Sequence, residues 1–432
     1  MLFLLESISE YSSAVLTILL LFAGIYLTVK TGFFQIKGLC LSFKSVINSI
    51  KIKDKNSLKS MLLALGGTVG VGNIAGVGTA ITLGGAGSVF WIWVCGFIGM
   101  ITKYSEVYLA VKFKPLGPYE YIKRTFGVFG KSINYIFCIA CVLSSLLIGN
   151  IIQSKAVIDT LGLAFNFDYS LCTAFIGIPV FILAFSDGEF IKKTSSFAVP
   201  FVSILYVLLT LIVILRHINY LPSVLQNIFV DAFSVKSSTA GVLGFFVSAT
   251  VRQGISKGLF SHEAGQGSSP IAYSAEENAD PHNSAILGIL EVFIDTGIIS
   301  SLTAFAMLTS GFWSENGMIS AANMFINHFD KIGGILFAIS IYLFCIAAIS
   351  GWIFYAKRSI NIICNNKIIS FIYSLSLIFI IPFVALFPID LLWQLSDILM
   401  LAMTLPNLVS VIKFKYIVID SIRMCKNVRK SL

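Results

Sequence analysis

Two short glycine-rich segments interrupt two of the long apolar stretches of this 432-residue chain. The first is 66–76, which reads GGTVGVGNIAG, and the second is 260–269, which reads FSHEAGQGSS. Each lies early in its half of the chain. Unwound backbone at membrane depth leaves N–H and C=O groups free where no water can satisfy them. Paired interruptions of this kind are typical of the central site of a secondary transporter.

The composition indicates a polytopic membrane protein. Hydrophobic residues make up 57% of the chain and charged residues 12%, whereas a soluble domain carries about 25% charged residues. Mean hydropathy is +0.90. The net charge of +9 could suggest a nucleic-acid partner, but the basic residues fall in clusters separated by loops that are poor in them, the positive-inside pattern. These clusters lie at 37–59, 112–131, 192–193, 357–367 and 413–430.

About eleven apolar stretches are long enough to cross a bilayer as helices. The expected spans are 13–36, 61–82, 86–112, 130–159, 170–186, 196–217, 240–273, 283–310, 331–362, 368–387 and 391–412. Threading them with the basic loops inside predicts an outside N-terminus and a cytoplasmic C-terminus. Glu6 and Glu10 stand where a signal peptide has basic residues, so we expect the first helix to be retained.

The number of spans predicts an internal repeat. Spans two to six and seven to eleven form two sets of five, and an odd number inverts the second set relative to the first. We therefore expect one all-α transporter domain over 1–432. It would contain a peripheral helix at 13–36, repeats at 61–217 and 240–412, and a basic cytoplasmic tail at 413–432.

The first interruption has three competing interpretations: a dinucleotide site, close helix packing and unwinding for a ligand. Gly70, Gly72 and Ala75 match a dinucleotide fingerprint, but no acidic residue follows at the required distance and the next segment is another apolar span. Small residues four apart also suit close helix packing. Packing does not explain why Thr68 and Asn73 accompany so many glycines, and this favours unwinding for a ligand.

Several polar side chains at membrane depth are candidates for function, because burying them costs about 2.5–3.5 kcal/mol each for charged groups. Ser261, His262 and Glu263 stand in the second interruption; the alternative is a structural network at a helix end. Metal binding there is disfavoured, because no second His or Cys has ligand spacing. Asn150 and Gln153 can share a helix face.

Other charged groups have a structural alternative of equal weight. Lys155 is either deep in its span or near its outer end, where its ammonium would reach the interface. Glu291, Asp295 and Asp397 are either buried structural acids or part of an ion path. Glu106 is expected to pair with Lys103 near a cytoplasmic helix end.

The chain resembles the alanine or glycine:cation symporters, the sodium:alanine symporter family of the amino acid–polyamine–cation superfamily. The matching segments run in order at 67–77, 84–91, 99–106, 149–153, 258–265, 292–296, 351–352 and 406–408. The resemblance implies a leucine-transporter-like fold of five plus five inverted helices, in which the first and sixth are broken. It implies import of alanine or glycine by symport, usually with Na⁺, across the plasma membrane. We expect a carrier rather than an enzyme, with no cofactor and no obligate protein partner.

The resemblance also implies a substrate site. Its residues would be Thr68, Gly70, Gly72, Asn73, Gln153, Ser261, Gly265 and Trp352. The positive end of a half-helix in the first break would face the carboxylate of the amino acid. The second break and Gln153 would hold the polar end, and Trp352 would keep the side-chain pocket small.

This chain departs from the family pattern at positions that bear on the ion. Lys155 and His262 stand where the family has Asn, and Ala347 and Ala348 stand where it has a Ser–Thr pair. Hard cations need oxygen ligands, which methyl groups do not supply.

Two coupling mechanisms therefore remain open. In one, Na⁺ binds through backbone carbonyls and side chains, for which Asn150, Glu263 and Asp295 are candidates. In the other, Lys155 or His262 carries a proton or replaces the ion.

Two other classes compete with a carrier. An ion channel is disfavoured because the chain has no filter motif or ring-forming repeat. A transporter-derived sensor or an inactive paralogue is consistent with the changed polar positions. Saturable uptake that other solutes compete with would distinguish a carrier from both.

Overall fold

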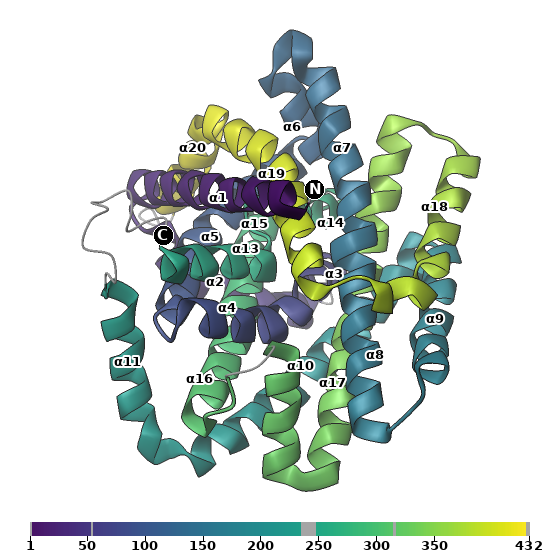
Figure 1. Ribbon diagram of the computed structural model, residues 1–432. Coiled ribbons are helices and arrows are strands. Elements are labelled where there is room, and N and C mark those ends of the chain that lie inside the picture. Colours follow the sequence, from purple (N-terminus) through teal and green to yellow (C-terminus); the bar gives the residue numbers. More distant parts are fainter. Residues whose placement is uncertain (1, 53–54, 235–247, 314–316, 429–432) are drawn as a thin grey trace.

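The computed structural model describes residues 2–52, 55–234, 248–313 and 317–428, and all regular structure within these ranges is helical (Figure 1). The helices of the first half are α1 Leu2–Thr31, α2 Phe34–Ile52, α3 Lys55–Thr68, α4 Val77–Gly84, α5 Ser88–Lys112, α6 Pro118–Thr125, α7 Gly130–Leu146, α8 Ile152–Phe165, α9 Tyr169–Phe185, α10 Gly188–Arg216 and α11 Leu221–Phe233. Those of the second half are α13 Ala249–His262, α14 Pro270–Ser274, α15 Pro281–Val292, α16 Ser301–Ser310, α17 Gly317–Ile363, α18 Lys367–Phe379, α19 Ile389–Lys413 and α20 Lys415–Val428. Short 3₁₀ turns are η2 Gly127–Phe129, η4 Ile218–Tyr220 and η6 Ile381–Leu386, and π-helical segments are η1 Gly72–Gly76, η3 Leu147–Ile151 and η5 Phe293–Ser300.

The helices are those of a membrane protein. Among the described residues, seven helical stretches are long and apolar enough to cross a bilayer, and the bent pair α3–α4 makes eight. Helices α9 and α18 are apolar but shorter, with 17 and 13 residues, and they pack side by side at one edge of the bundle (Figure 1). Part of the expected span at 240–273 lies outside the described residues. The predicted total of eleven spans stays a prediction.

The chain bends by 50° between α3 and the η1–α4 segment, where the sequence predicts the first break. Glycines on both sides let the backbones of α3 and α17 touch. A Cβ atom at Gly351 would lie 2.6 Å from the Cα atom of Gly67. Such small-residue contacts hold membrane helices together where lipid offers no hydrophobic driving force.

The second break is a loop between α13 and α14. Glu263, Gly265 and Gly267 have φ values of 53°, 90° and 79°, so the chain leaves the right-handed helix region three times within five residues. Pro270 then starts α14, where a missing N–H costs nothing. The loop stays buried throughout, so its polar backbone groups must find partners inside the protein.

Three π-helical segments lie inside helices that the sequence analysis treats as regular or simply broken. Segment η1 precedes α4, η3 joins α7 to α8, and η5 joins α15 to α16. A π turn widens the helix and changes which side chains share a face, and such turns occur frequently at functional sites.

Several element bounds differ from the expected ones. Helix α1 begins at Leu2 rather than at 13, and helices α2 and α20 occupy the basic segments expected to be a loop and a tail. Helix α20 buries Val418, Ile419 and Ile422 on one face. In amphipathic helices of this kind apolar residues alternate with polar ones, so the helix contains no continuous apolar stretch that would mark it in the sequence.

Helix α17 is interrupted at Asp330, which has a φ of 54°. Residues 317–329 form a helix between the expected spans 283–310 and 331–362, and the second of these spans follows over 331–363. The domain bounds at 61–217 and 240–412 stay predictions.

The basic clusters gather at one end of the bundle. Lys413 donates to the carbonyl of Thr125 at 2.5 Å, Lys114 to that of Glu277 at 2.6 Å, and Lys192 pairs with Glu276 at 3.5 Å. Helices α13 and α19 begin at the opposite end, where Arg252 pairs with Glu10 of α1 at 2.9 Å.

Candidate functional site

Side chains satisfy the unwound backbone of the first break. Gly70 N donates to Asn73 Oδ1 at 3.0 Å, and Val71 N donates to Gln153 Oε1 at 3.4 Å. These N–H groups stand at the beginning of the half-helix that continues through η1 into α4. Such groups have no partner within a helix and favour anions. This is the arrangement that the resemblance implies for the carboxylate of an amino acid.

A buried cluster of oxygen atoms surrounds the side chain of Asn73. Its Nδ2 atom lies 2.7 Å from Ser261 Oγ, 2.9 Å from Asp295 Oδ1, 3.1 Å from the Asp295 carbonyl oxygen and 3.1 Å from Ser300 Oγ. An amide nitrogen has only two hydrogens to donate. Four oxygens therefore share two donated hydrogens, so the cluster holds more acceptors than the amide can satisfy.

Asp295 supplies the negative charge of this cluster. Its Oδ2 atom accepts from Ser261 Oγ and, at 2.9 Å, from Thr296 Oγ1. Ser300 Oγ contacts the Asp295 carbonyl at 3.3 Å, five residues back, which the π turn of η5 permits. Carboxylate, hydroxyl and carbonyl oxygens are the ligands that hard cations take. Across the described ranges, no three His, Cys, Asp or Glu side chains gather as a metal site.

Glu106 of α5 holds the second break. Its two carboxylate oxygens each accept one backbone N–H, from Gly265 and Gly267, both at 3.1 Å. Asn407 of α19 donates to Glu106 Oε2 at 2.7 Å and to the carbonyl of Gly265 at 2.8 Å. The carboxylate thus accepts two backbone N–H groups of the loop that would otherwise donate to helical carbonyls.

Lys103 is fully buried beside this loop. Its ammonium lies 3.8 Å from Glu106 and 3.1 Å from Glu291 of α15, so the expected pair with Glu106 is confirmed and has a closer third member. Tyr273 donates to the other oxygen of Glu291 at 2.9 Å. Buried charges are tolerated only when they are paired and hydrogen-bonded in this way.

The predicted substrate residues lie around the two breaks, but Thr68 and Gly265 have their polar groups engaged within the protein. A Cβ atom at Gly70 would lie 3.0 Å from Gln153 Oε1, and Trp352 packs on Gly149 of η3. Thr68 directs its hydroxyl at the Leu65 carbonyl of its own helix, at 3.1 Å. Gly265 already uses both backbone groups in the contacts with Glu106 and Asn407.

Among the candidates for ion coupling, Asp295 belongs to the oxygen cluster, and the others lie outside it. Asn150 donates to the Leu377 carbonyl of α18 at 2.8 Å. Lys155 is half-buried and lines a cavity with Asp159. His262 Nδ1 accepts from Ala264 N at 2.9 Å, and its Nε2 lies 3.3 Å from Cys95 Sγ.

The remaining candidates are buried near the two breaks. Glu263 accepts from Ser268 within the second break. Ala347 and Ala348 are fully buried, and a Cβ atom at Gly70 would lie 3.4 Å from that of Ala348.

Three residues near the breaks are not predicted as site residues from the sequence. Ser300 and Thr296 belong to the oxygen cluster. In an α-helix, positions 295 and 300 would point about 140° apart, so only a π turn brings them together. Tyr355 directs its hydroxyl at the backbone of Gly67, and this oxygen has no hydrogen-bond partner among the described residues.

Comparison with known proteins identifies the family. The profile of the sodium:alanine symporter family matches residues 3–431. The sodium/alanine symporter AgcS of Methanococcus maripaludis is 29% identical over 96% of this chain and 94% of its own length. The probable sodium/glutamine symporter GlnT of Bacillus subtilis is 29% identical over 95% of this chain and 87% of its own.

A solved structure supports the fold. The manganese transporter of Eremococcus coleocola superposes with a TM-score of 0.57 and 14% identity, covering 82% of this chain and 78% of that protein. At this identity the likeness concerns the fold alone. The match of the family profile over nearly the whole length is the stronger finding, and the chain belongs to the sodium:alanine symporter family, a family of membrane carriers for cation-coupled amino-acid symport.

Proposed function

We propose that the chain imports a small neutral amino acid, alanine or glycine, together with Na⁺. The observation that carries this proposal is the convergence of four oxygens on Asn73 Nδ2. Na⁺ would bind among these oxygens, and Asp295 would balance its charge. One charge moving through 100 mV releases about 2.3 kcal/mol, enough for about a fiftyfold solute gradient.

The amino acid would bind between the two breaks. Its carboxylate would take the N–H groups of Gly70 and Val71, which Asn73 and Gln153 satisfy in this conformation. Its ammonium would meet carbonyls of the second break. The Phe260 carbonyl faces the first break, because a Cβ atom at Gly72 would lie 3.3 Å from it. Trp352 would limit the space for a side chain.

The architecture we propose is the five-plus-five inverted repeat with α1 as a peripheral helix. The two repeats would rock around the breaks and expose the site to either side in turn. The N-terminus would lie outside, because Lys114, Lys192 and Lys413 gather at the end of the bundle opposite to Glu10.

Proton coupling through Lys155 or His262 is the second mechanism. Lys155 lines a cavity beside Asp159, and His262 contacts Cys95, so neither side chain belongs to the oxygen cluster. Because neither side chain contributes an atom to the oxygen cluster, we favour Na⁺ as the coupling ion.

Uptake of radiolabelled alanine into proteoliposomes tests the proposal. A Na⁺ gradient, a proton gradient or neither would be imposed at matched membrane potential. We expect accumulation only with Na⁺. Accumulation with a proton gradient alone would refute Na⁺ coupling, and no saturable accumulation under any gradient would refute the carrier.

Gly72→Leu is expected to abolish uptake. A Cβ atom at this position would lie 2.8 Å from the Phe260 ring, a distance that real Cβ atoms do not show. Gly177→Leu is the matched control, because Gly177 of α9 has open space at its Cβ position. Both variants would be compared for uptake at equal amounts of folded protein. A fully active Gly72→Leu protein would contradict the close approach of the two breaks.

Gln153→Ala is expected to raise the alanine concentration for half-maximal uptake about tenfold. Gln153 lies beside the backbone of the first break, and its amide would hold the polar end of the bound amino acid. Loss of one hydrogen bond to a charged group costs about 1.5–3 kcal/mol, which is tenfold or more in affinity. Gln226→Ala on the exposed face of α11 is the control. An unchanged half-maximal concentration would remove Gln153 from the site.

A further inference from the structure

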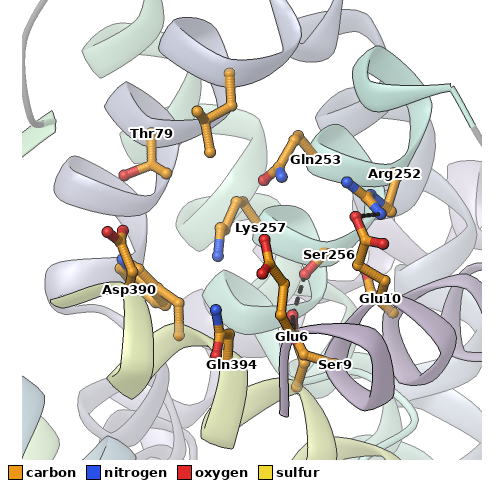
Figure 2. A pocket seen from close by; sticks show the side chains of 14 residues that line it. Glu6, Ser9, Glu10, Thr79, Arg252, Gln253, Ser256, Lys257, Asp390 and Gln394 are labelled. Carbon is orange, nitrogen blue, oxygen red and sulfur yellow. Dashed lines mark hydrogen bonds and ion pairs between the residues drawn. The ribbon is translucent and has the colours of Figure 1, made fainter. Parts of the chain in front are cut away.

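We propose a second amino-acid subsite in a polar pocket at the end of the bundle opposite to the basic clusters. In this pocket Lys257 binds the carboxylate of the solute. The pocket has a volume of about 320 Å³ and lies between α1, α4, α13 and α19 (Figure 2). Cavities of this size hold small ligands. The charged residues that line it are Glu6, Glu10, Arg252, Lys257, Asp390 and Asp397.

Lys257 is the residue that points to a ligand. Its side chain is 5% exposed, yet it lines the pocket and points its ammonium into it (Figure 2), where the charges of Asp397 and Asp390 act on it. The ammonium lies 4.0 Å from the centre of the Trp393 ring, and it makes no hydrogen bond or ion pair with any residue of the described ranges. An aromatic face attracts a cation, but it is a poor hydrogen-bond acceptor. The ammonium faces the pocket with three N–H donors, to which a bound carboxylate could supply acceptors.

The other charges of the pocket select a zwitterion. Glu10 is paired with Arg252 at 2.9 Å, and Asp397 accepts the hydroxyls of Ser9 at 3.2 Å and Ser256 at 3.1 Å.

Glu6 and Asp390 are exposed and line the same pocket. Four carboxylates and two cationic side chains give a formal charge of −2, which disfavours a simple anion. An amino acid would place its carboxylate on Lys257 and its ammonium toward Glu6 or Asp390.

An aromatic layer separates this pocket from the first break. The Trp393 ring stands edge-on to Phe260 with centroids 4.7 Å apart, and Phe260 packs on Gly72. Trp393 and Thr79 also line the next cavity, together with Val71. A solute held on Lys257 is therefore one layer of side chains from the proposed central site. This inference rests on the proposed function for its substrate class and on the proposed orientation for its outer location.

Lys257→Met tests the subsite, because methionine keeps the apolar stem against Trp393 and removes the charge. We expect the KM of alanine uptake to rise about tenfold, because the substrate loses one hydrogen bond to a charged group. We expect kcat and the Na⁺ dependence to stay unchanged. Lys331→Met, an exposed lysine beyond the interruption of α17, is the matched control. An unchanged KM, or a lower kcat at constant KM, would overturn the proposal.

Equilibrium binding separates the two sites. We expect purified protein to bind radiolabelled alanine at two classes of site, with the weaker class retained in Gly72→Leu and lost when Lys257→Met is added. Propionate and ethylamine, which carry one charge each, are expected to displace alanine from the weak class poorly. Displacement by propionate alone would indicate a plain anion site and refute the zwitterion.

The same data distinguish the two proposals. If wild-type protein accumulates alanine and binds it at a single class of site, the subsite is refuted and the proposed function stands. If wild-type protein neither binds nor accumulates an amino acid, the proposed function is refuted and the subsite is refuted with it.

Discussion

Asp295→Asn is expected to abolish Na⁺-driven uptake or to raise the Na⁺ concentration for half-maximal uptake about 10- to 150-fold. The substitution keeps the shape of the side chain and removes the negative charge of the oxygen cluster. Ser261 and Thr296 donate to this carboxylate, and Asn73 Nδ2 lies 2.9 Å from it. Interactions with a charged group contribute about 1.5–3 kcal/mol, which gives the stated range.

The measurement is alanine uptake into proteoliposomes as a function of external Na⁺. Asp330→Asn is the control, because Asp330 is exposed and the substitution makes the same change of charge at nearly constant shape. Thermal unfolding in detergent would check that Asp295→Asn remains folded. An Asp295→Asn protein with the Na⁺ dependence of the wild type would exclude the cluster as the ion site.

The two breaks could be predicted from the sequence because glycine has a local effect. The segment at 66–76 carries five glycines, and the segment at 260–269 combines two glycines with six polar side chains, and both compositions disfavour a continuous apolar helix. The apolar spans are equally local, since about 20 apolar residues predict a bilayer crossing in any context. The family resemblance rests on the same segments.

The composition of the oxygen cluster could not be predicted in full. The sequence marks Asn73, Ser261 and Asp295 as polar groups at membrane depth, but nothing in it brings them together. Ser300 lies on a different face from Asp295 under the α-helical period and joins it only through the π turn of η5. A π turn depends on tertiary contacts and has no simple sequence signal.

The sequence also does not predict which lysine lies at a binding site, as Lys155 and Lys257 show. Lys155 stands where the resemblance implies Asn, yet it lines a cavity with Asp159 and contributes no atom to the cluster. Lys257 stands in an unremarkable part of α13, and only the fold brings it over Trp393 and into a pocket. Which lysine meets a ligand depends on packing between distant helices rather than on position along the chain.

Glu106→Gln is expected to destabilise the protein by about 3–5 kcal/mol, the cost of removing one partner from a buried ionic network. Glu106 accepts Gly265 N and Gly267 N on separate oxygens and pairs with Lys103. Glutamine has one acceptor oxygen, so its amide nitrogen would face a second donor. The second break would lose the group that replaces its helical hydrogen bonds, and we expect uptake to fall with it.

Thermal unfolding in detergent, with and without alanine and Na⁺, measures this effect. Glu120→Gln is the matched control, because Glu120 forms an i,i+4 pair with the largely exposed Arg124 at 2.6 Å, and surface pairs of this type contribute about 0–1 kcal/mol. We expect the unfolding midpoint to fall clearly for Glu106→Gln and to stay within error for Glu120→Gln. Equal midpoints for the two variants would mean that the loop at 263–269 is held by its packing against α5 and α19 rather than by the carboxylate of Glu106.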